Sequence, residues 1–507
     1  MKLGDLELTT VLKKISNSAS WLGLIIPPKD MAELNQAITN LSPLDLASLD
    51  LKIRTLNHSY ISDFNQSWDK LRSAGISRLA KSQYAVCLLG LSSFHHNGYV
   101  RETAVNLLAQ QRTGKELPFL LIRLNDWVIQ VREAALAAIK KRIKPVYAAF
   151  FLINMELVLR LKRAGRVDQI LLDEIINLLR SPECQEVLQN GMTCKDKNIR
   201  RISYKLAHEA DVIGRQIILG SAINDPDTVV RYWAARHFLP EVPPEEIPDL
   251  IKTMLGDRYM PVRREALWVI ATKRPDLATG PIRRALLDNH VSIRETARHF
   301  ISLALIADAR TFYIEAIQRG VDSERYAAIC GLAENGVTAD ASFILSYTDS
   351  QLPKLRRAAV YALGKLSVEG NLARLVGSLS DPNASVSREA LKALLPQARL
   401  IPLDNLEDLL TRADKFHSRR NALTLIQHFD KWRKLPALLI SIGYKDLQIA
   451  ELALAAVREW FANYNRSFSE PTLSDFKKIQ ACLPGVEAKL PHHISIELRD
   501  CLKIYFK

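Results

Sequence analysis

The stretch DRYMPVRREALWVIA, residues 257–271, joins a short polar turn to a helix with one apolar face. Val262 and Ala266 lie four residues apart, and therefore on the same face of that helix. Closely similar stretches begin at Asp126 (DWVIQVREAALAAI) and at Asp381 (DPNASVSREALKAL). This recurrence predicts an array built by repeating one helical unit.

The repeat period follows from an aliphatic anchor residue with a small residue four positions later. Successive small residues lie about 31 residues apart, except for one gap of about two periods before Ser203. The clear copies are Val100/Ala104, Val131/Ala135, Val230/Ala234, Val262/Ala266, Ile293/Ala297, Leu355/Ala359 and Val386/Ala390, and the imperfect ones are Ile199/Ser203, Glu324/Ala328 and Ser418/Ala422. A unit of this length holds two helices and a turn, so stacked neighbours must complete its core.

The predicted fold is therefore all-α: an α-solenoid of stacked antiparallel helix pairs. In each regular unit an apolar first helix precedes a turn with an aspartate five residues before the anchor, namely Asp126, Asp225, Asp257, Asp288 or Asp381. Five segments are expected: an N-terminal helical cap at 1–80, first repeats at 81–165, a degenerate repeat at 166–195, regular repeats at 196–460 and a C-terminal helical cap at 461–507.

The unit D-x-x-x-x-V-R-x-x-A-x-x-A-L resembles the HEAT-repeat family, in particular its short subclass that is similar to phycobilisome-lyase repeats. The resemblance covers about residues 84–460. It implies a HEAT-like superhelix in which the second helix of each pair lines the concave side. Family members serve as scaffolds, transport receptors, chromophore lyases, an iron hydroxylase and DNA glycosylases, so the resemblance implies a fold and not an activity.

Position +1 after the anchor is an arginine in all but one copy. These residues, here named the arginine ladder, are Arg101, Arg132, Arg200, Arg231, Arg263, Arg294, Arg325, Arg356 and Arg419, with Ser387 as the exception. One interpretation is a ladder for phosphate groups. The favoured interpretation is structural, because the resemblance implies pairing with the turn aspartate of the same or a neighbouring unit, and a guanidinium suits such ties.

Positions +2 and +6 point away from the predicted core and mix bases with rings from residue 201 onward. This set, here named the stripe, consists of Arg201, Lys205, Tyr232, Arg236, Arg264, Trp268, His299, Tyr326, Arg357, Tyr361, Arg388, Lys392 and Arg420. Cations neutralise phosphates and rings stack on bases, but the same surface also suits an acidic protein or peptide. A solvated helix face of chance composition is the plain alternative.

Two other motifs have ordinary structural explanations. The basic runs KKRIK at 140–144 and RLKRAGR at 160–166 suit phosphate or anionic lipid, but cations at helix ends also complement the helix dipole. His208-Glu209 is a single pair where an iron site of the HEAT-like hydroxylase kind needs several, so no metal site and no cofactor are predicted.

Composition indicates the kind of compartment and partner. Lys and Arg exceed Asp and Glu by 69 to 55, a net charge of +14, which favours anionic partners. The six cysteines form no CxxC pair, so a reducing compartment is expected. The N-terminus lacks the apolar run of a signal peptide, and no stretch is apolar enough to span a bilayer. We therefore expect a cytoplasmic protein.

The sequence favours a non-enzymatic HEAT-like scaffold or adaptor that binds an anionic macromolecule, with an acidic protein surface or peptide as the first choice. The second choice is binding to a DNA or RNA backbone, with or without glycosylase activity, for which Glu295, Trp268 and His299 are the candidate group. A third is an immunity-type scaffold that neutralises a toxin. No nucleotide-binding glycine motif or nucleophile elbow occurs to indicate another enzyme class.

Overall fold

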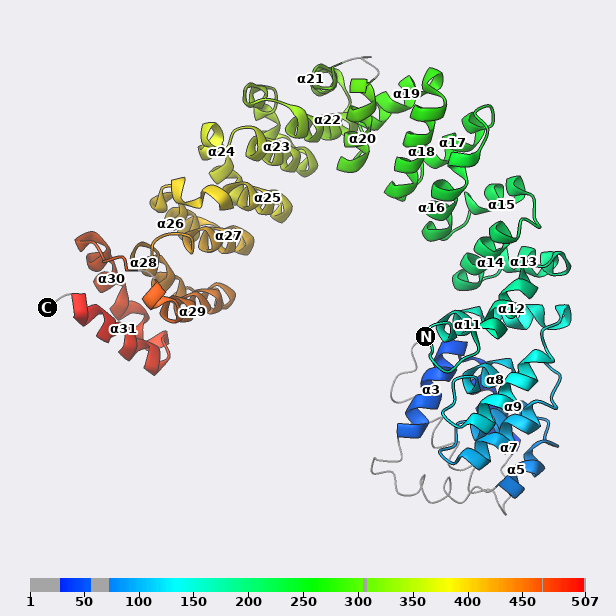
Figure 1. The fold of residues 1–507 in the computed structure, drawn as a ribbon. Helices are drawn as coiled ribbons and strands as arrows, with labels where there is room; N and C mark the ends of the chain where they lie inside the picture. The colour runs from blue at the N-terminus through cyan, green and yellow to red at the C-terminus, as the bar shows by residue number, and fades with distance from the viewer. Residues whose placement is uncertain (1–27, 56–72, 304–307, 467, 506–507) are drawn as a thin grey trace. The chain divides into compact units, whose positions relative to one another are not determined.

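The computed structural model describes residues 28–55, 73–303, 308–466 and 468–505, which form helices joined by turns (Figure 1). No β-strand occurs among these residues. The chain divides into two compact units, unit 1 at Met1–Glu241 and unit 2 at Val242–Lys507. The predicted all-α solenoid of stacked, HEAT-like helix pairs is confirmed within each unit.

The described part of unit 1 contains α-helices and short 3-10 helices. They are α2 (Pro28–Thr39), α3 (Pro43–Thr55), α5 (Ser73–Leu79), α6 (Ala85–Ser92), α7 (Gly98–Leu108), α8 (Leu117–Arg123), α9 (Ile129–Lys140), η2 (Pro145–Tyr147), α10 (Ala148–Ile153), α11 (Met155–Leu161), α12 (Gln169–Leu179), η3 (Pro182–Cys184), α13 (Gln185–Met192), α14 (Lys197–Ala210), α15 (Arg215–Ala222), α16 (Thr228–His237) and η4 (Leu239–Glu241).

Unit 2 continues the alternation of first and second helices. Its elements are α17 (Ile247–Leu255), α18 (Met260–Lys273), α19 (Pro275–Leu286), α20 (Val291–Leu303), α21 (Ala309–Arg319), α22 (Asp322–Asn335), η5 (Thr338–Phe343), η6 (Leu345–Asp349), α23 (Pro353–Leu366), η7 (Glu369–Asn371), α24 (Leu372–Gly377), η8 (Ser378–Ser380), α25 (Ala384–Leu394), η9 (Leu395–Leu400), α26 (Leu403–Arg412), α27 (Phe416–Ile426), α28 (Lys431–Ile442), α29 (Leu447–Ala462), η10 (Tyr464–Arg466), α30 (Leu473–Val486), η11 (Glu487–Lys489) and α31 (His492–Tyr505).

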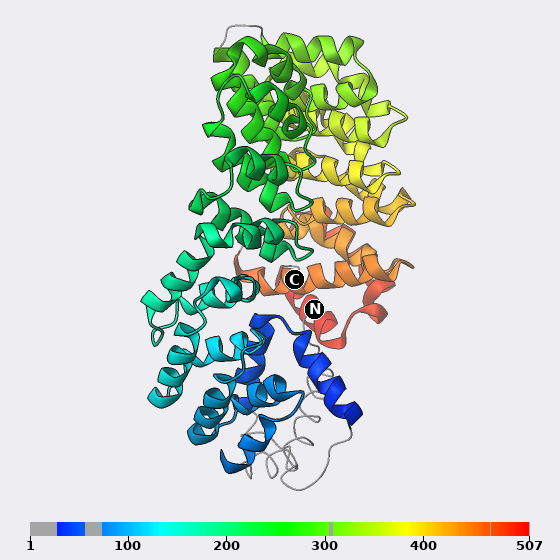
Figure 2. The same ribbon diagram turned by 90° about the vertical axis from the view of Figure 1, so that its right-hand side faces the viewer.

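The second helices of successive pairs pack side by side and form one layer of each unit. In unit 2 the order is α18, α20, α22, α23, α25, α27 and α29, each against the next. First helices such as α19, α21 and α26 pack against the second helices of their own pairs, and Figure 2 shows the resulting rows from the side. Side chains at equivalent positions of the second helices therefore become neighbours.

Each regular second helix follows a turn aspartate that accepts a hydrogen bond from the backbone N–H two residues on. The pairs are Asp126 with Val128 (3.0 Å), Asp225 with Asp227 (2.7 Å), Asp257 with Tyr259 (2.7 Å), Asp288 with His290 (2.8 Å) and Asp381 with Asn383 (2.8 Å). This Asx turn directs the chain into the helix, which explains why the repeat begins with aspartate.

The anchor residues and the small residues after them lie in the core. Val131, Ala135, Val262 and Ala266 are all fully buried. A side chain as small as alanine lets the helices of one pair and the next approach closely, while the aliphatic anchor fills the space between them. The period seen in the sequence is thus the period of core contacts.

The five predicted segments remain a prediction, and parts of the two caps lie outside the described residues. The described part of 1–80 contains α2, α3 and α5, and that of 461–507 contains η10, α30, η11 and α31. Segment 166–195 contains α12 and α13, of which α13 packs against α14. Among the helices that the structure describes, none is both long enough and apolar enough to cross a membrane.

Candidate partner-binding surface

Arginines of the ladder pair with the turn aspartate that follows 25 residues later, in the next unit. The pairs are Arg101–Asp126 (2.8 Å), Arg200–Asp225 (3.0 Å), Arg263–Asp288 (2.8 Å) and Arg356–Asp381 (2.6 Å). Each of these arginines also donates to carbonyls of its own turn, as Arg263 does to Asp257 at 2.8 Å. One guanidinium therefore ties two consecutive turns together, and its donors are used within the protein.

Ladder arginines also donate to backbone carbonyls and pair with other carboxylates. Arg132 and Arg231 donate to carbonyls of their own turns, at 2.7 Å and 2.8 Å. Arg294 pairs with Glu334 of α22 rather than with a turn aspartate. Arg294 is buried and the Glu334 side chain is 10% exposed, so an ion pair between two helices replaces the predicted pair with a turn aspartate.

Arg325 and Ser387 depart from the ladder pattern. Arg325 pairs with Asp322 of its own helix at 3.0 Å. At Ser387, where the arginine is missing, the hydroxyl donates to the Leu379 carbonyl at 2.6 Å and accepts from the Asn421 amide at 2.8 Å. A neutral hydrogen-bonded pair thus occupies the place that an ion pair fills in earlier units.

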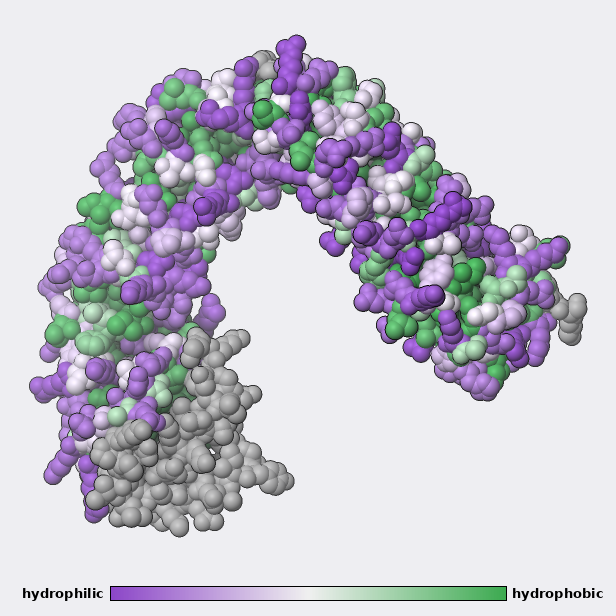
Figure 3. Space-filling view, turned by 180° about the vertical axis from the view of Figure 1, so that it is seen from behind, coloured by the Kyte–Doolittle hydropathy of each residue, from purple (hydrophilic) through white to green (hydrophobic). Residues whose placement is uncertain are grey.

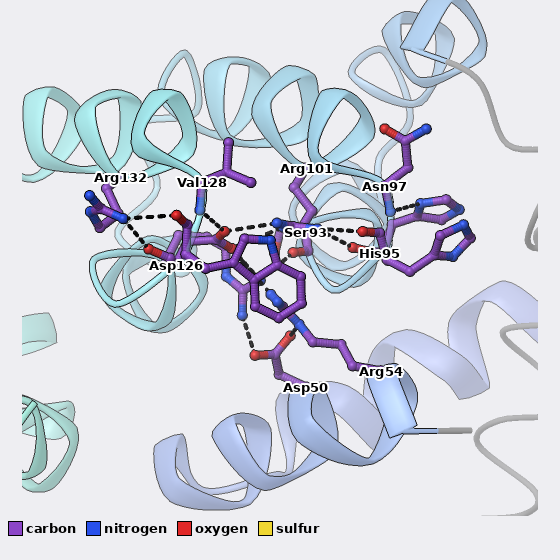
Figure 4. Close-up of polar contacts among 12 residues, drawn as sticks. Asp50, Arg54, Ser93, His95, Asn97, Arg101, Asp126, Val128 and Arg132 are labelled. Carbon is purple, nitrogen blue, oxygen red and sulfur yellow. Dashed lines mark hydrogen bonds and ion pairs between the residues drawn. The ribbon is translucent and has the colours of Figure 1, made fainter. Parts of the chain in front are cut away.

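The turn aspartate Asp126 accepts hydrogen bonds from one ladder arginine and from two other arginines (Figure 4). Its carboxylate accepts from Arg101 at 2.8 and 2.9 Å, and from Arg54 and Arg123, each at 3.2 Å. Asp126, Arg101 and Arg123 are all buried. Because Arg54 belongs to α3, the same carboxylate also attaches an N-terminal helix to the first repeats. Asp50 of α3 completes the group by accepting from Arg54 and Arg123.

Burial raises the pKa of the Asp50 carboxyl to about 6 from its ordinary value of 3.8. The folded protein therefore binds more protons at this site than the unfolded chain between about pH 4 and about pH 6. The stability that Asp50 contributes is complete below that window and is lost as the pH rises through it.

We compare the free energy of unfolding of the wild type with that of the Asp50→Asn variant. The wild-type value minus the variant value should fall as the pH rises from about 4 to about 6, and should then level off. Urea unfolding at a series of pH values measures this difference. A difference that grows with pH would mean that the neighbouring arginines lower the pKa of Asp50 and that burial does not dominate.

In unit 1, two bases of the stripe have acidic neighbours. Arg201 donates to Asp227 at 2.5 and 3.1 Å, and this hydrogen bond holds the pKa of the Asp227 carboxyl below its usual value. The ammonium of Lys205 lies 3.9 Å from Glu209. Arg201 is half-buried and Lys205 is exposed, so Lys205 is the more accessible of the two charges.

Two tyrosines of the stripe are held by neighbouring cations. Arg236 donates to the Tyr232 hydroxyl at 3.1 Å within α16. In unit 2, Arg357 of α23 donates to the Tyr326 hydroxyl of α22 at 3.3 Å, and the Lys354 ammonium lies 4.0 Å from the centre of the Tyr326 ring. Cation–π contacts of this kind fix the ring and occupy one of its faces.

The middle of the stripe is an aromatic cluster in unit 2. Trp268 of α18 is 42% exposed, and its ring lies 5.6 Å from His299 and 4.7 Å from Phe300, both on α20. Beside it, Arg264 and Glu295 line a shallow hollow together with Trp268. A large ring that is partly exposed and fixed by its neighbours is the kind of side chain that contributes most to protein interfaces.

The C-terminal part of the stripe combines two exposed bases with two half-buried side chains. Arg388 and Lys392 on α25 are exposed, and Lys392 lies 3.7 Å from Glu389. Tyr361 is half-buried, and burial raises the pKa of its hydroxyl. Arg420 of α27 is half-buried with its guanidinium 3.4 Å from the Asn421 side-chain oxygen.

Several bases of the stripe have carboxylate neighbours that positions +2 and +6 do not include. Asp227 and Glu209 neighbour its bases in unit 1, and Glu265 and Glu389 do so in unit 2. Glu265 and Glu389 stand at position +3, one residue beyond the positions considered, so extending the pattern by one residue would have found them. On the face drawn in Figure 3, hydrophilic side chains predominate and hydrophobic ones appear in small groups. The stripe is thus a surface of mixed charge with rings, and less basic than positions +2 and +6 alone indicate.

The basic run at 140–144 is partly structural. Arg142 is buried, pairs with Glu116 at 2.8 Å and donates to the Ala138 carbonyl at 2.8 Å. It also donates to carbonyls of the turn after α7. The Arg142 guanidinium is therefore paired within the fold, where it stabilises that turn. Lys140 and Lys141 of the same run are exposed.

The His208-Glu209 pair is also engaged within the fold. The His208 ring packs against Trp233 and Phe238, at 5.6 and 4.4 Å between ring centres. Glu209 forms an ion pair with Arg180. In the part of the chain that the structure describes, no group of three or more His, Cys, Asp or Glu side chains is arranged to hold a metal ion.

Solved structures of helical-repeat proteins resemble this chain at low sequence identity. Kap121p matches with a TM-score of 0.37 at 13% identity, over 88% of this chain and 58% of Kap121p. Importin beta matches with a TM-score of 0.31 at 12% identity, over 97% of this chain and 80% of importin beta. This chain thus spans little more than half the length of Kap121p. No protein-family model and no curated protein sequence matches it. Likenesses this weak carry no argument about partner or activity.

Proposed function

We propose that this chain is a non-enzymatic HEAT-like scaffold that binds an acidic protein partner through the stripe of unit 2. The observation that supports this proposal is the exposed, fixed Trp268 together with the open bases Arg388 and Lys392, all on second helices of one layer. Rigid helices present these groups, so little conformational entropy is lost on docking.

The mixed charge of the stripe favours a protein over a nucleic-acid backbone. Acids stand next to several of its bases, as Glu265 does to Arg264 at 3.8 Å and Glu389 to Lys392 at 3.7 Å. Such carboxylates would repel a row of phosphates, whereas a protein surface can offer both charges.

DNA or RNA binding is the second candidate, supported by the group Glu295, Trp268 and His299. Glu295 is exposed, whereas a carboxylate that transfers protons in a glycosylase is ordinarily held in a desolvated site. We therefore place nucleic-acid binding, with or without base release, behind protein binding. The toxin-neutralising scaffold is a special case of the first proposal and needs the same surface.

We expect the double variant Arg388→Glu/Lys392→Glu to weaken binding of a labelled Glu-Tyr random copolymer by about tenfold or more, since two contacts become repulsive. Fluorescence anisotropy at constant ionic strength measures this. The matched control is Arg283→Glu/Arg284→Glu on α19, two exposed bases outside the stripe with the same change in net charge.

Equal losses in both variants would show that only net charge matters, and the stripe would then have no special role. Labelled single- and double-stranded DNA and RNA form the second arm of the titration. Tighter binding of a nucleic acid than of the copolymer, dependent on the stripe and steeply weakened by salt, would replace the first proposal with the second.

A further inference from the structure

A hollow in unit 1 lies among α3, α11 and the turn between α8 and α9, which pack against one another. Its volume is about 570 Å³, within the range of sites that accept small ligands or peptide side chains. Arg160, Arg163 and Arg166 line it together with Trp127. The hollow does not involve the stripe, which begins at residue 201.

The three arginines of this hollow are exposed and available. Among the ion pairs of the described residues, none involves Arg160, Arg163 or Arg166. Arg160 lies in the last turn of α11 and complements its dipole. Arg163 and Arg166 lie beyond the end of that helix, so the dipole does not explain them.

The acids that line the same hollow do not neutralise those arginines. Asp126 accepts from Arg54, Arg101 and Arg123, and Asp50 accepts from Arg54 and Arg123. These carboxylates are therefore already paired with other guanidinium groups. The rim keeps an excess of positive charge that attracts an anionic ligand.

The remaining lining is apolar. Leu51 of α3 is 55% exposed and Trp127 is 58% exposed, whereas Leu157 and Leu161 of α11 are buried behind the hollow. The Trp127 ring is held in place by the guanidinium groups of Arg54 and Arg101, which lie 4.8 and 4.9 Å from its centre. A fixed ring and an exposed aliphatic side chain in one hollow are suited to receive an apolar side chain.

We propose that this hollow docks a short acidic peptide segment of a partner protein. An apolar side chain of the segment contacts Trp127 and Leu51, and the carboxylates of the segment meet Arg160, Arg163 and Arg166 in the forked geometry that guanidinium groups favour. A nucleic-acid strand would use the arginines and the ring but not the aliphatic side chain of Leu51, which is why a peptide fits better.

The test measures fluorescence anisotropy of the full-length protein with a labelled synthetic peptide in which Asp and Glu residues flank a central Phe-Leu pair. We expect Arg160→Glu/Arg163→Glu/Arg166→Glu to weaken binding by about tenfold or more. The matched control is Arg112→Glu/Lys140→Glu/Lys141→Glu, which changes the net charge equally at exposed positions outside the hollow. Equal losses in the two variants would overturn the proposal.

Two further probes test the apolar contact and the class of ligand. A peptide with Ser in place of Phe and Leu should bind about tenfold more weakly to the unchanged protein; equal binding would overturn the docking of an apolar side chain. The second probe is a labelled oligothymidine. If it binds more tightly than the peptide, and the Arg160→Glu/Arg163→Glu/Arg166→Glu variant loses that binding, the ligand of the hollow is a nucleic acid and not a peptide. The stripe variant Arg388→Glu/Lys392→Glu should bind this peptide normally, so either proposal can fail alone.

Discussion

Replacing Asp126 with alanine is expected to lower the free energy of unfolding by about 3–5 kcal/mol, the range for removing one partner from a buried ion pair. Asp126 is 4% exposed and is the common acceptor for Arg54, Arg101 and Arg123. Its loss leaves three guanidinium groups with fewer acceptors, two of them without contact to water. Urea unfolding followed by circular dichroism measures the change.

The control for Asp126→Ala is Asp173→Ala in the same unit. Asp173 pairs with Lys162 on the surface, with the two side chains 57% and 37% exposed, and an ion pair of that kind contributes about 0.2–1 kcal/mol. A loss at Asp126 no larger than the loss at Asp173 would mean that the buried cluster does not hold unit 1 together. The double variant Arg101→Ala/Asp126→Ala should lose less than the sum of its single changes.

Replacing Trp432 with alanine is expected to lower the free energy of unfolding by about 3–5 kcal/mol, because a large buried ring leaves a cavity. Trp432 is fully buried, and its ring lies 5.5 Å from Trp460 and 5.9 Å from Tyr464. Its indole N–H also donates to the Ser469 carbonyl at 2.7 Å. The same urea titration measures the loss.

Trp268→Ala is the matched substitution with the opposite expectation. Trp268 is 42% exposed, so its removal should cost about 1 kcal/mol or less of stability while weakening partner binding by about tenfold or more. If Trp268→Ala unfolded unit 2 and left binding of the Glu-Tyr copolymer unchanged, Trp268 would be a core residue and not a contact for a partner.

The resemblance of one unit to the next made the helix pairs and the turn aspartates predictable. Val262, Ala266 and Asp257 act within one unit and its neighbour, and the same contacts recur down the chain. The repeated sequence pattern therefore predicts these core and turn contacts in every regular unit. The ladder pair of Arg263 with Asp288 was predictable for the same reason, since the same 25-residue spacing recurs in the pairs of Arg101, Arg200 and Arg356.

The candidate surface was less predictable, because the charge at a surface depends on more than the residues of one helix face. The bases of the stripe were found by position, but Asp227 next to Arg201 and Glu389 next to Lys392 belong to other positions or turns. The hollow at Arg160 needed α3 and the turn after α8 as well as its own helix. From the sequence alone, the position of Arg160 indicated only that it lies near the end of a helix.

The sequence by itself determined the repeating helix pair, its core positions and the turn aspartate, because each depends on residues within about one repeat length. The tertiary structure alone decided which charges are neutralised and which face solvent. Arg54 meets Asp126 across 72 residues and Arg294 meets Glu334 across 40. Electrostatic contacts of that kind depend on how packed helices bring distant side chains within a few ångströms, and no local period encodes them.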